Sequence, residues 1–382
     1  MIAIIAPAAP ASIRLPLGRP ASSSYLFLAY PLAILAWRGR GESWLHEHFV
    51  QLYHTPSRGL KVYTHPHCTS THMAQVYDAD FTGIAQQLVD PRQLQGDPLH
   101  ELQKQLSQGV YPQVDVDMGR LGLTRDRRPF LHEILLCGHD STRFEVLAFD
   151  TGGRLRRQWI EATSLAAALD VDGGALLRTL TQEGETVPAW LRADWCGRPQ
   201  WILHEPTRHV EEGVDDADPA RVLQELAHYV TNQPAADLPE ARSCADTQLP
   251  ADTRWGHGAQ SGIIDAMRQP GTDCPMICLR LWWEHKRLMA HRLRWLAQLH
   301  GAPSFAAKQM EVLARRAGAL RMSVLRHERQ TRRAVVASPG RASIADGIEA
   351  IGKIEEQLLS TLFDQVQSLS GSWVKLSEAG TP

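Results

Sequence analysis

Two apolar runs joined by a turn constrain this chain more than any other feature. The runs LHEILLCG and RFEVLAFD occupy residues 131–138 and 143–150, and both have the length of a strand. Gly138 and Asp140 at their junction are residue types that tight turns prefer. We therefore predict a β-hairpin here, within a sheet region that spans residues 110–150.

His132 and Asp150 lie at the open end of this hairpin. A loop of three residues (140–142) or of five (139–143) places them directly opposite each other. Opposed side chains have Cβ atoms about 4.5–5.5 Å apart, so a carboxylate can accept the Nδ1 proton of an imidazole. Nε2 would then be free to act as a general base. The alternative is an ordinary cross-strand polar pair, although both residues have apolar neighbours on their faces, where an unpaired polar group is costly.

The segments around the hairpin predict an α+β lobe at the N-terminal end. Residues 24–38 contain the apolar stretch YLFLAYPLAILAW after three serines, which predicts a buried helix with a serine cap. Residues 74–108 have two helical patterns, and residues 110–118 alternate apolar and acidic side chains as a half-buried strand does. We expect a central helix packed on an antiparallel sheet within residues 1–174.

The last third of the chain has three long helical patterns, which predict a C-terminal helical bundle. They cover residues 277–299, 305–335 and 344–369. Residues 175–250 are rich in acidic side chains and proline, which is typical of a connector or a small subdomain. Because 382 residues exceed what one core usually organises, we predict three parts: 1–174, 175–250 and 251–382.

Composition excludes several classes of protein. A net charge of −2 with 43% hydrophobic residues is typical of neither disordered nor fibrous chains. The six cysteines follow no CxxC or disulfide-framework spacing, which favours reduced thiols in a cytoplasm. The apolar run over residues 25–37 is shorter than the roughly 20 residues that a membrane-crossing helix needs. We therefore expect a cytoplasmic protein with no membrane segment.

A strong charge asymmetry lies in the helical region. Residues 277–342 carry 14 Lys and Arg against three Glu, in a protein whose net charge is −2. Such a surface attracts an anionic partner, unless it pairs with the acidic residues 211–218 of the same chain. Nucleic acid is a weaker alternative, because tryptophans lie nearby but no recognised nucleic-acid module is present.

Several of these motifs together resemble a known family. The hairpin with His132, Asp140 and Asp150, and the preceding strand with Asp115 and Asp117, resemble the histidine and aspartate segment of papain-like peptidases. They also resemble the N-terminal domain of the butirosin-biosynthesis H-protein, an acyltransferase, and similar proteins associated with nonribosomal peptide and polyketide clusters. Two further segments resemble the latter group, namely Trp44 with Phe49–Leu52 and Trp283–Met289.

The resemblance implies a nucleophilic cysteine at the start of the first buried helix, where the helix N-terminus favours a thiolate. This chain has Ser22, Ser23 and Ser24 there instead. Ser24 is the best placed to act as a nucleophile activated by His132, but the same serines would serve equally as helix caps. Cys68 is a substitute nucleophile in the lobe, although a lone cysteine is more often a small buried apolar residue.

The segment around Cys68 also raises the possibility of a metal site. His65, His67 and His72 flank this cysteine, and imidazole and thiolate are both ligands that zinc accepts. The spacing matches no standard zinc motif. We therefore expect neither a metal nor a resident cofactor.

The function that the resemblance implies is acyl transfer or amide formation on a thioester bound to a carrier protein, with His132 as the base and Asp150 orienting it. An acidic carrier, bearing a phosphopantetheine arm, would dock on the basic helices in 277–342, and a small amine would accept the acyl group. Two alternatives stay open. One is a non-catalytic adaptor with a degenerate peptidase-like fold, and the other is a hydrolase of a thioester or peptide.

Overall fold

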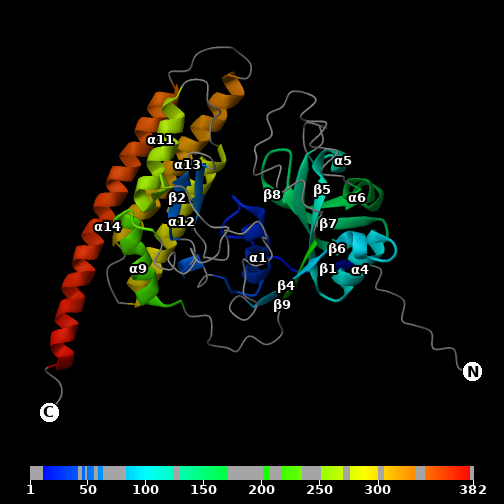
Figure 1. Ribbon diagram of the computed structural model, residues 1–382, viewed down its shortest axis with the longest axis horizontal. Coiled ribbons are helices and arrows are strands. Elements are labelled where there is room, and N and C mark those ends of the chain that lie inside the picture. The colour runs from blue at the N-terminus through cyan, green and yellow to red at the C-terminus, as the bar shows by residue number, and fades with distance from the viewer. Residues whose placement is uncertain are drawn as a thin grey trace, which may run out of the picture. The chain divides into compact units, whose positions relative to one another are not determined.

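The computed structural model divides the chain into two compact units (Figure 1). The first unit comprises Met1–Gly41 and Thr71–Val214, and the second comprises Glu42–Ser70 and Asp215–Pro382. The structure describes residues 12–41, 45–47, 50–55, 59–62, 83–123, 130–170, 201–206, 217–234, 251–269, 276–299, 305–331 and 340–378.

An antiparallel sheet forms the framework of the first unit. Its strands follow the order β4-β9-β5-β6-β7-β8, and β1 pairs with the far end of β6. Their bounds are β1 Ile13–Arg14, β4 Ile84–Val89, β5 Tyr111–Asp117, β6 Leu131–His139, β7 Arg143–Phe149, β8 Leu155–Glu161 and β9 Trp201–Pro206. The predicted hairpin is confirmed as β6 and β7 with a three-residue loop between them.

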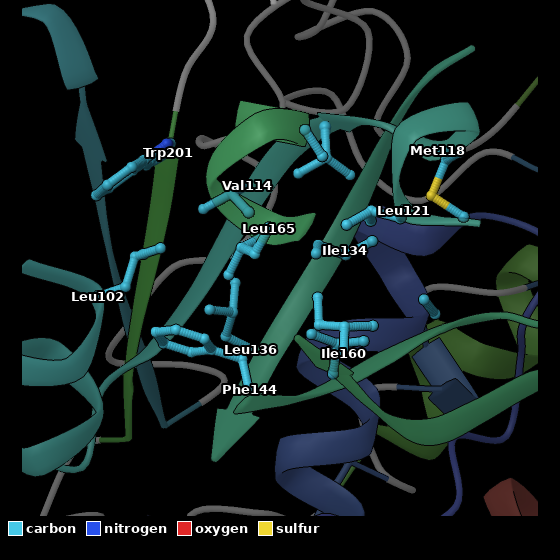
Figure 2. Close-up of a cluster of buried hydrophobic side chains, with 14 of the residues drawn as sticks. Leu102, Val114, Met118, Leu121, Ile134, Leu136, Phe144, Ile160, Leu165 and Trp201 are labelled. Atoms are coloured by element: carbon cyan, nitrogen blue, oxygen red, sulfur yellow. The ribbon is translucent and has the colours of Figure 1, made fainter. Parts of the chain in front are cut away.

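Both faces of this sheet are buried, and strand alternation decides which face each side chain joins. On one face, Val116, Ile134 and Leu136 belong to a first core that Figure 2 shows in close-up. Leu135 and Cys137, which alternate with Ile134 and Leu136 along β6, belong to a second core on the other face. Burying each large apolar side chain contributes about 1.5–3 kcal/mol, so both faces stabilise the sheet.

Different helices cover the two faces. The first core includes side chains of α4 (Pro98–Ser107), α5 (Met118–Leu121) and α6 (Ala162–Leu169). The second core includes α1 (Leu26–Trp37), whose sequence LFLAYPLAILAW is apolar all round, as in a helix buried on every side. The predicted central helix on an antiparallel sheet is therefore present, with α1 on one face of the sheet.

The helix predicted in the first half of residues 74–108 is wrong where the structure describes it. Residues 84–89 form β4, which pairs along its whole length with β9. A local pattern could not reveal this partner, because β9 lies more than 100 residues later in the predicted connector. The second half is correct, since α4 follows the cap Asp97, whose carboxylate accepts the N–H of Leu99.

The second unit is mainly helical. Its long helices α12, α13 and α14 confirm the three predicted helical patterns, and Figure 1 shows them beside α11. The bounds are α9 Pro219–Val230, α11 Gln260–Arg268, α12 Met276–Leu299, α13 Phe305–Thr331 and α14 Gly340–Glu378. A small sheet β10-β2-β3 (Arg254–Trp255, Leu52–Thr55 and Gly59–Val62) and the 3-10 turn η4 (Gly256–Ala259) complete the unit.

The two units do not follow the predicted division at residues 174 and 250. Segment 42–70 joins the helical unit, whereas β9 joins the sheet of the first unit. The reason for the first difference is specific, because the buried His285 and Arg292 of α12 donate hydrogen bonds to backbone carbonyls within residues 45–50. No helix in the described part of the chain is both long and apolar enough to cross a membrane.

Candidate functional site

The imidazole of His132 lies in the sheet, and no acid among the described residues orients it. In the strand register His132 is opposite Val116 of β5, which places it on the face of the first core. Its Nδ1 accepts the backbone N–H of Glu133 at 2.9 Å. An Nδ1 that accepts a hydrogen bond carries no proton, which is the reverse of the tautomer that a catalytic dyad needs.

Asp150 lies beyond the end of β7, in the turn that leads to β8. One carboxylate oxygen accepts the backbone N–H groups of Gly152 and Arg154, at 2.8 and 2.9 Å. The other oxygen lies 3.3 Å from Nε of Arg156. The hydrogen bond from Arg154 is the main reason why the pKa of Asp150 is lowered. Its carboxylate therefore organises a turn, and no hydrogen bond or ion pair joins it to His132.

The register explains why the predicted dyad does not form. Leu135 pairs with Leu147 and Leu136 with Val146, as the predicted register requires, but the paired residues of β6 and β7 end at Leu135–Leu147. Towards its other end, β6 contains a bulge at Cys137. At the open end of the hairpin, where His132 and Asp150 lie, β6 and β7 are therefore not paired with each other.

Ser24 belongs to the segment that leads into α1, the helix on the face opposite the first core. The cap position of α1 is Tyr25, one residue after the three serines, and no side-chain capping hydrogen bond is made at that position. Ser24 is 6% exposed, and no hydrogen bond joins it to His132. The structure therefore does not bring the predicted nucleophile and base together.

Cys68 and the neighbouring histidines His65, His67 and His72 lie outside the described residues. Among the residues that are described, no group of three or more His, Cys, Asp or Glu side chains could hold a metal ion.

A buried hydrogen-bonded chain crosses four strands of the first unit. The Nδ1 of His204 lies 3.1 Å from the side-chain amide of Gln86, and its Nε2 lies 2.9 Å from Oε1 of Gln113. Gln113 in turn donates to the carboxylate of Glu133 at 2.9 Å. Because Oε1 of Gln113 can only accept, Nε2 of His204 carries the proton. Burial lowers the pKa of His204 to about 3, so this imidazole is neutral.

The second unit contains a buried polar cluster that the sequence did not predict. The ammonium of Lys286 on α12 lies 2.5 Å from Oε2 of Glu355 on α14, and both side chains are 0% exposed. Gln260 donates to the same oxygen at 3.0 Å, and Tyr229 lies within 3.3 Å of it. Lys286 also donates to the Tyr229 hydroxyl at 3.0 Å. This buried polar cluster connects α9, α11, α12 and α14.

Two further buried side chains of α12 connect this helix to segment 42–70. His285 donates through Nε2 to the carbonyl of Val50 at 2.7 Å. The guanidinium of Arg292 donates to the carbonyls of Leu45 and His46, at 2.6 and 2.7 Å. Burial lowers the pKa of His285 and lowers that of Arg292 to about 9. These contacts satisfy the Arg292 guanidinium and Nε2 of His285, whereas Nδ1 of His285 is buried with no hydrogen-bond partner among the described residues.

A signal for this burial was present in the sequence. Glu284, His285 and Lys286 look like an exposed charged triplet when read in order, yet each is at most 1% exposed. His285 and Arg292 fall on the same helical stripe as Trp282, Met289 and Leu296, all of which are buried. The helical spacing of these positions therefore indicates the buried face of α12, although the charged residue types at some of them would suggest an exposed face.

The basic surface predicted over residues 277–342 is present only in part. Lys286 and Arg292 are buried, so they do not contribute to the predicted basic surface. The exposed cations on the described face of α13 are Lys308, Arg315, Arg316 and Arg326. None of these four forms an ion pair with another described residue. We call them the α13 basic face.

Comparison with known proteins assigns the chain to no family. No family model matches it, and no curated protein matches it with significance.

Proposed function

We propose that the protein is a non-catalytic adaptor that docks an acidic partner on the α13 basic face. The observation that carries the proposal is the set of exposed cations along one helix, without ion-pair partners among the described residues. Uncompensated surface charge accelerates the encounter with a partner of opposite charge. An acidic carrier protein of a biosynthetic assembly line is the partner that the sequence resemblance suggests.

The arrangement around His132 supports an adaptor rather than an enzyme. The nitrogen that an orienting acid should contact is occupied by the N–H of Glu133. The carboxylate of Asp150 is engaged by its own turn and by Arg156. A triad would require both groups to leave these partners, each of which is worth about 0.5–3 kcal/mol.

Acyl transfer with His132 as the base is the competing proposal, and one observation favours it. Burial lowers the pKa of His132, so the imidazole is neutral near pH 7. A neutral imidazole is the form that can accept a proton from an amine or a serine. A thioester hydrolase would use the same base with water as the acceptor.

The experiment that tests the adaptor proposal measures binding and turnover together. Association with an acidic, acylated carrier protein is followed by biolayer interferometry at two salt concentrations, and the acyl group is followed by mass spectrometry in the presence of amines. We expect binding that weakens with salt and no turnover. Arg315→Glu should slow association about three- to tenfold, because a surface charge mainly affects the association rate.

Lys353→Glu is the matched control, since it makes the same charge change at an exposed position on α14. Equal effects of Arg315→Glu and Lys353→Glu would contradict docking on the α13 basic face. Turnover that disappears in His132→Ala would replace the adaptor with the acyltransferase or the hydrolase.

A further inference from the structure

Helix α13 has a stripe of apolar and basic side chains on the side opposite the one that it buries. Met310, Ala317 and Val324 recur every seven residues and are at most 1% exposed, so they mark the buried side of the helix. The opposite side follows the series that starts at Phe305 and steps alternately by three and four residues to Arg326. We call the seven residues of this series the α13 mixed stripe.

The α13 mixed stripe exposes two large apolar side chains. Phe305 is 64% exposed and Met322 is 45% exposed. Between them in the series, Val312 is half-buried and Ala319 is exposed. Single exposed apolar side chains are ordinary, but these lie along one line of the helix with cations among them. An apolar line bordered by charged residues is typical of a surface that binds a partner.

The cations of the stripe are Lys308, Arg315 and Arg326, and all three are exposed. None of them forms an ion pair with another described residue. Glu311 lies three residues after Lys308 and four before Arg315, at spacings that allow an ion pair within a helix. It pairs instead with Arg294 of α12. The stripe therefore keeps three positive charges that an acidic partner would neutralise.

A lipid surface does not suit this arrangement. A helix that lies on a membrane separates its apolar face from its charged face, whereas Arg315 lies between Val312 and Met322 on the line of the stripe. Burying Met322 among acyl chains would carry this guanidinium out of water, which is costly. A partner helix avoids that cost, because it can place a carboxylate opposite each cation and apolar side chains opposite Phe305 and Met322.

We propose that the α13 mixed stripe docks one amphipathic helix of an acidic partner. The stripe extends over about 32 Å, or about six helical turns, because a helix rises about 1.5 Å per residue. Steps of three and four residues are those at which the side chains of two packed helices interdigitate. Charge complementarity selects a partner helix that carries carboxylates. The inference rests on the proposed function, because it names the part of the acidic partner that α13 binds.

Two synthetic peptides test this docking surface on the full-length protein. Both are fluorescein-labelled helices of about 22 residues, the length of the stripe, and both contain the same leucines and glutamates in a background of alanine and glutamine. The first peptide alternates leucine and glutamate at steps of three and four residues, whereas the second has them shuffled. Circular dichroism checks that their helix contents are equal. Fluorescence anisotropy should show at least tenfold tighter binding of the first peptide.

Substitutions in the stripe test its apolar part separately from its charge. Phe305→Ser and Met322→Ser should each weaken binding of the first peptide about three- to tenfold, because each removes apolar surface that the peptide would cover. Both side chains are exposed, so the fold does not depend on them. Ile354→Ser is the matched control, since Ile354 is an apolar residue of α14 that is 38% exposed. This control should leave the affinity unchanged.

The outcomes separate this inference from the adaptor proposal. Equal affinities for the two peptides, or equal effects of Met322→Ser and Ile354→Ser, would overturn the docking of a helix. Vesicles with phosphatidylserine that bind more tightly than the first peptide would overturn it as well and point to a lipid surface. An acidic carrier whose binding depends on Arg315, but not on Phe305 or Met322, would contradict the helix and leave the adaptor in place. Binding of the first peptide through Met322, in a protein that binds no acidic carrier, would support the docking surface and contradict the carrier as its partner.

Discussion

The buried charges of Lys286 and Glu355 compensate each other, because neither side chain is exposed to water. Removing one partner leaves a buried charge without compensation, which typically costs about 3–5 kcal/mol. We therefore expect Lys286→Met to lower the free energy of unfolding by about that amount. The double variant Lys286→Met with Glu355→Leu should recover most of the loss, because two apolar groups replace two charges. Urea denaturation followed by circular dichroism measures both effects.

The exposed ion pair between Arg268 and Asp346 provides the control. Its side chains are 47% and 68% exposed, so water screens the attraction. Arg268→Gln should cost about 1 kcal/mol or less. If Lys286→Met costs no more than Arg268→Gln, the buried pair does not hold α14 as the structure implies.

The chain of hydrogen bonds through His204 makes the sheet of the first unit sensitive to pH. The pKa of His204 is about 3 in the folded protein, against an ordinary value of 6.5. Between these two values the unfolded chain binds a proton that the folded protein does not. Stability should therefore fall as the pH falls below 6.5, by up to about 1.4 kcal/mol per pH unit from this group.

Replacing the imidazole should remove that dependence. We expect His204→Gln to be less stable than wild type at pH 7.5, but to lose about 2 kcal/mol less on going to pH 5.0. Urea unfolding at the two pH values measures the difference, and the remaining histidines contribute equally to both proteins. Parallel pH dependences in wild type and variant would mean that His204 takes up its proton without cost.

Local patterns predicted those elements whose partners lie nearby in the sequence. The β6–β7 hairpin, α1 and the long helices follow from apolar periodicity and from turn residues, and each was found where expected. Strand β4 was missed for two reasons. Its partner β9 is remote in the sequence, and in a segment of six residues apolar side chains four positions apart fit a strand as well as a helix. Elements with distant partners need information that a local window lacks.

The candidate site failed to follow from the sequence for a related reason. Residue numbers set the register of the hairpin correctly at Leu135 and Leu136, but they do not say where the pairing of β6 and β7 stops. The pairing stops at Leu135–Leu147, three residue pairs before His132 and Asp150 would be opposite each other.

At the scale of the whole molecule, the predicted bundle of residues 251–382 is incomplete by itself. Without segment 42–70, the buried Arg292 loses two carbonyl acceptors and His285 loses one. The same deletion removes β2 and β3, whose buried Leu52 and Leu60 contribute about 1.5–3 kcal/mol each when they pack in the unit. Since a domain is stable by only about 5–15 kcal/mol, we expect fragment 251–382 to show no cooperative thermal unfolding by circular dichroism.

A polypeptide that joins residues 42–70 to residues 215–382 through a Gly-Ser linker is the matching control. It restores the carbonyls of Leu45, His46 and Val50 together with Tyr229 of the buried polar cluster. This polypeptide should unfold cooperatively. Cooperative unfolding of fragment 251–382 at the same temperature would show that segment 42–70 contributes nothing essential.

The discontinuous second unit also has a consequence for synthesis on the ribosome. Segment 42–70 leaves the ribosome roughly 200 residues before α12, which corresponds to about 10–40 s at 5–20 residues per second. During that delay Leu52 and Leu60, which are at most 1% exposed in the finished protein, have no helices to cover them. The flanking residues belong to the first unit, whose last strand ends at Pro206. The first unit can therefore fold before α12 is synthesised, while segment 42–70, which is joined to it at both ends, still lacks its helices. We expect the nascent chain to depend most on a chaperone during this interval.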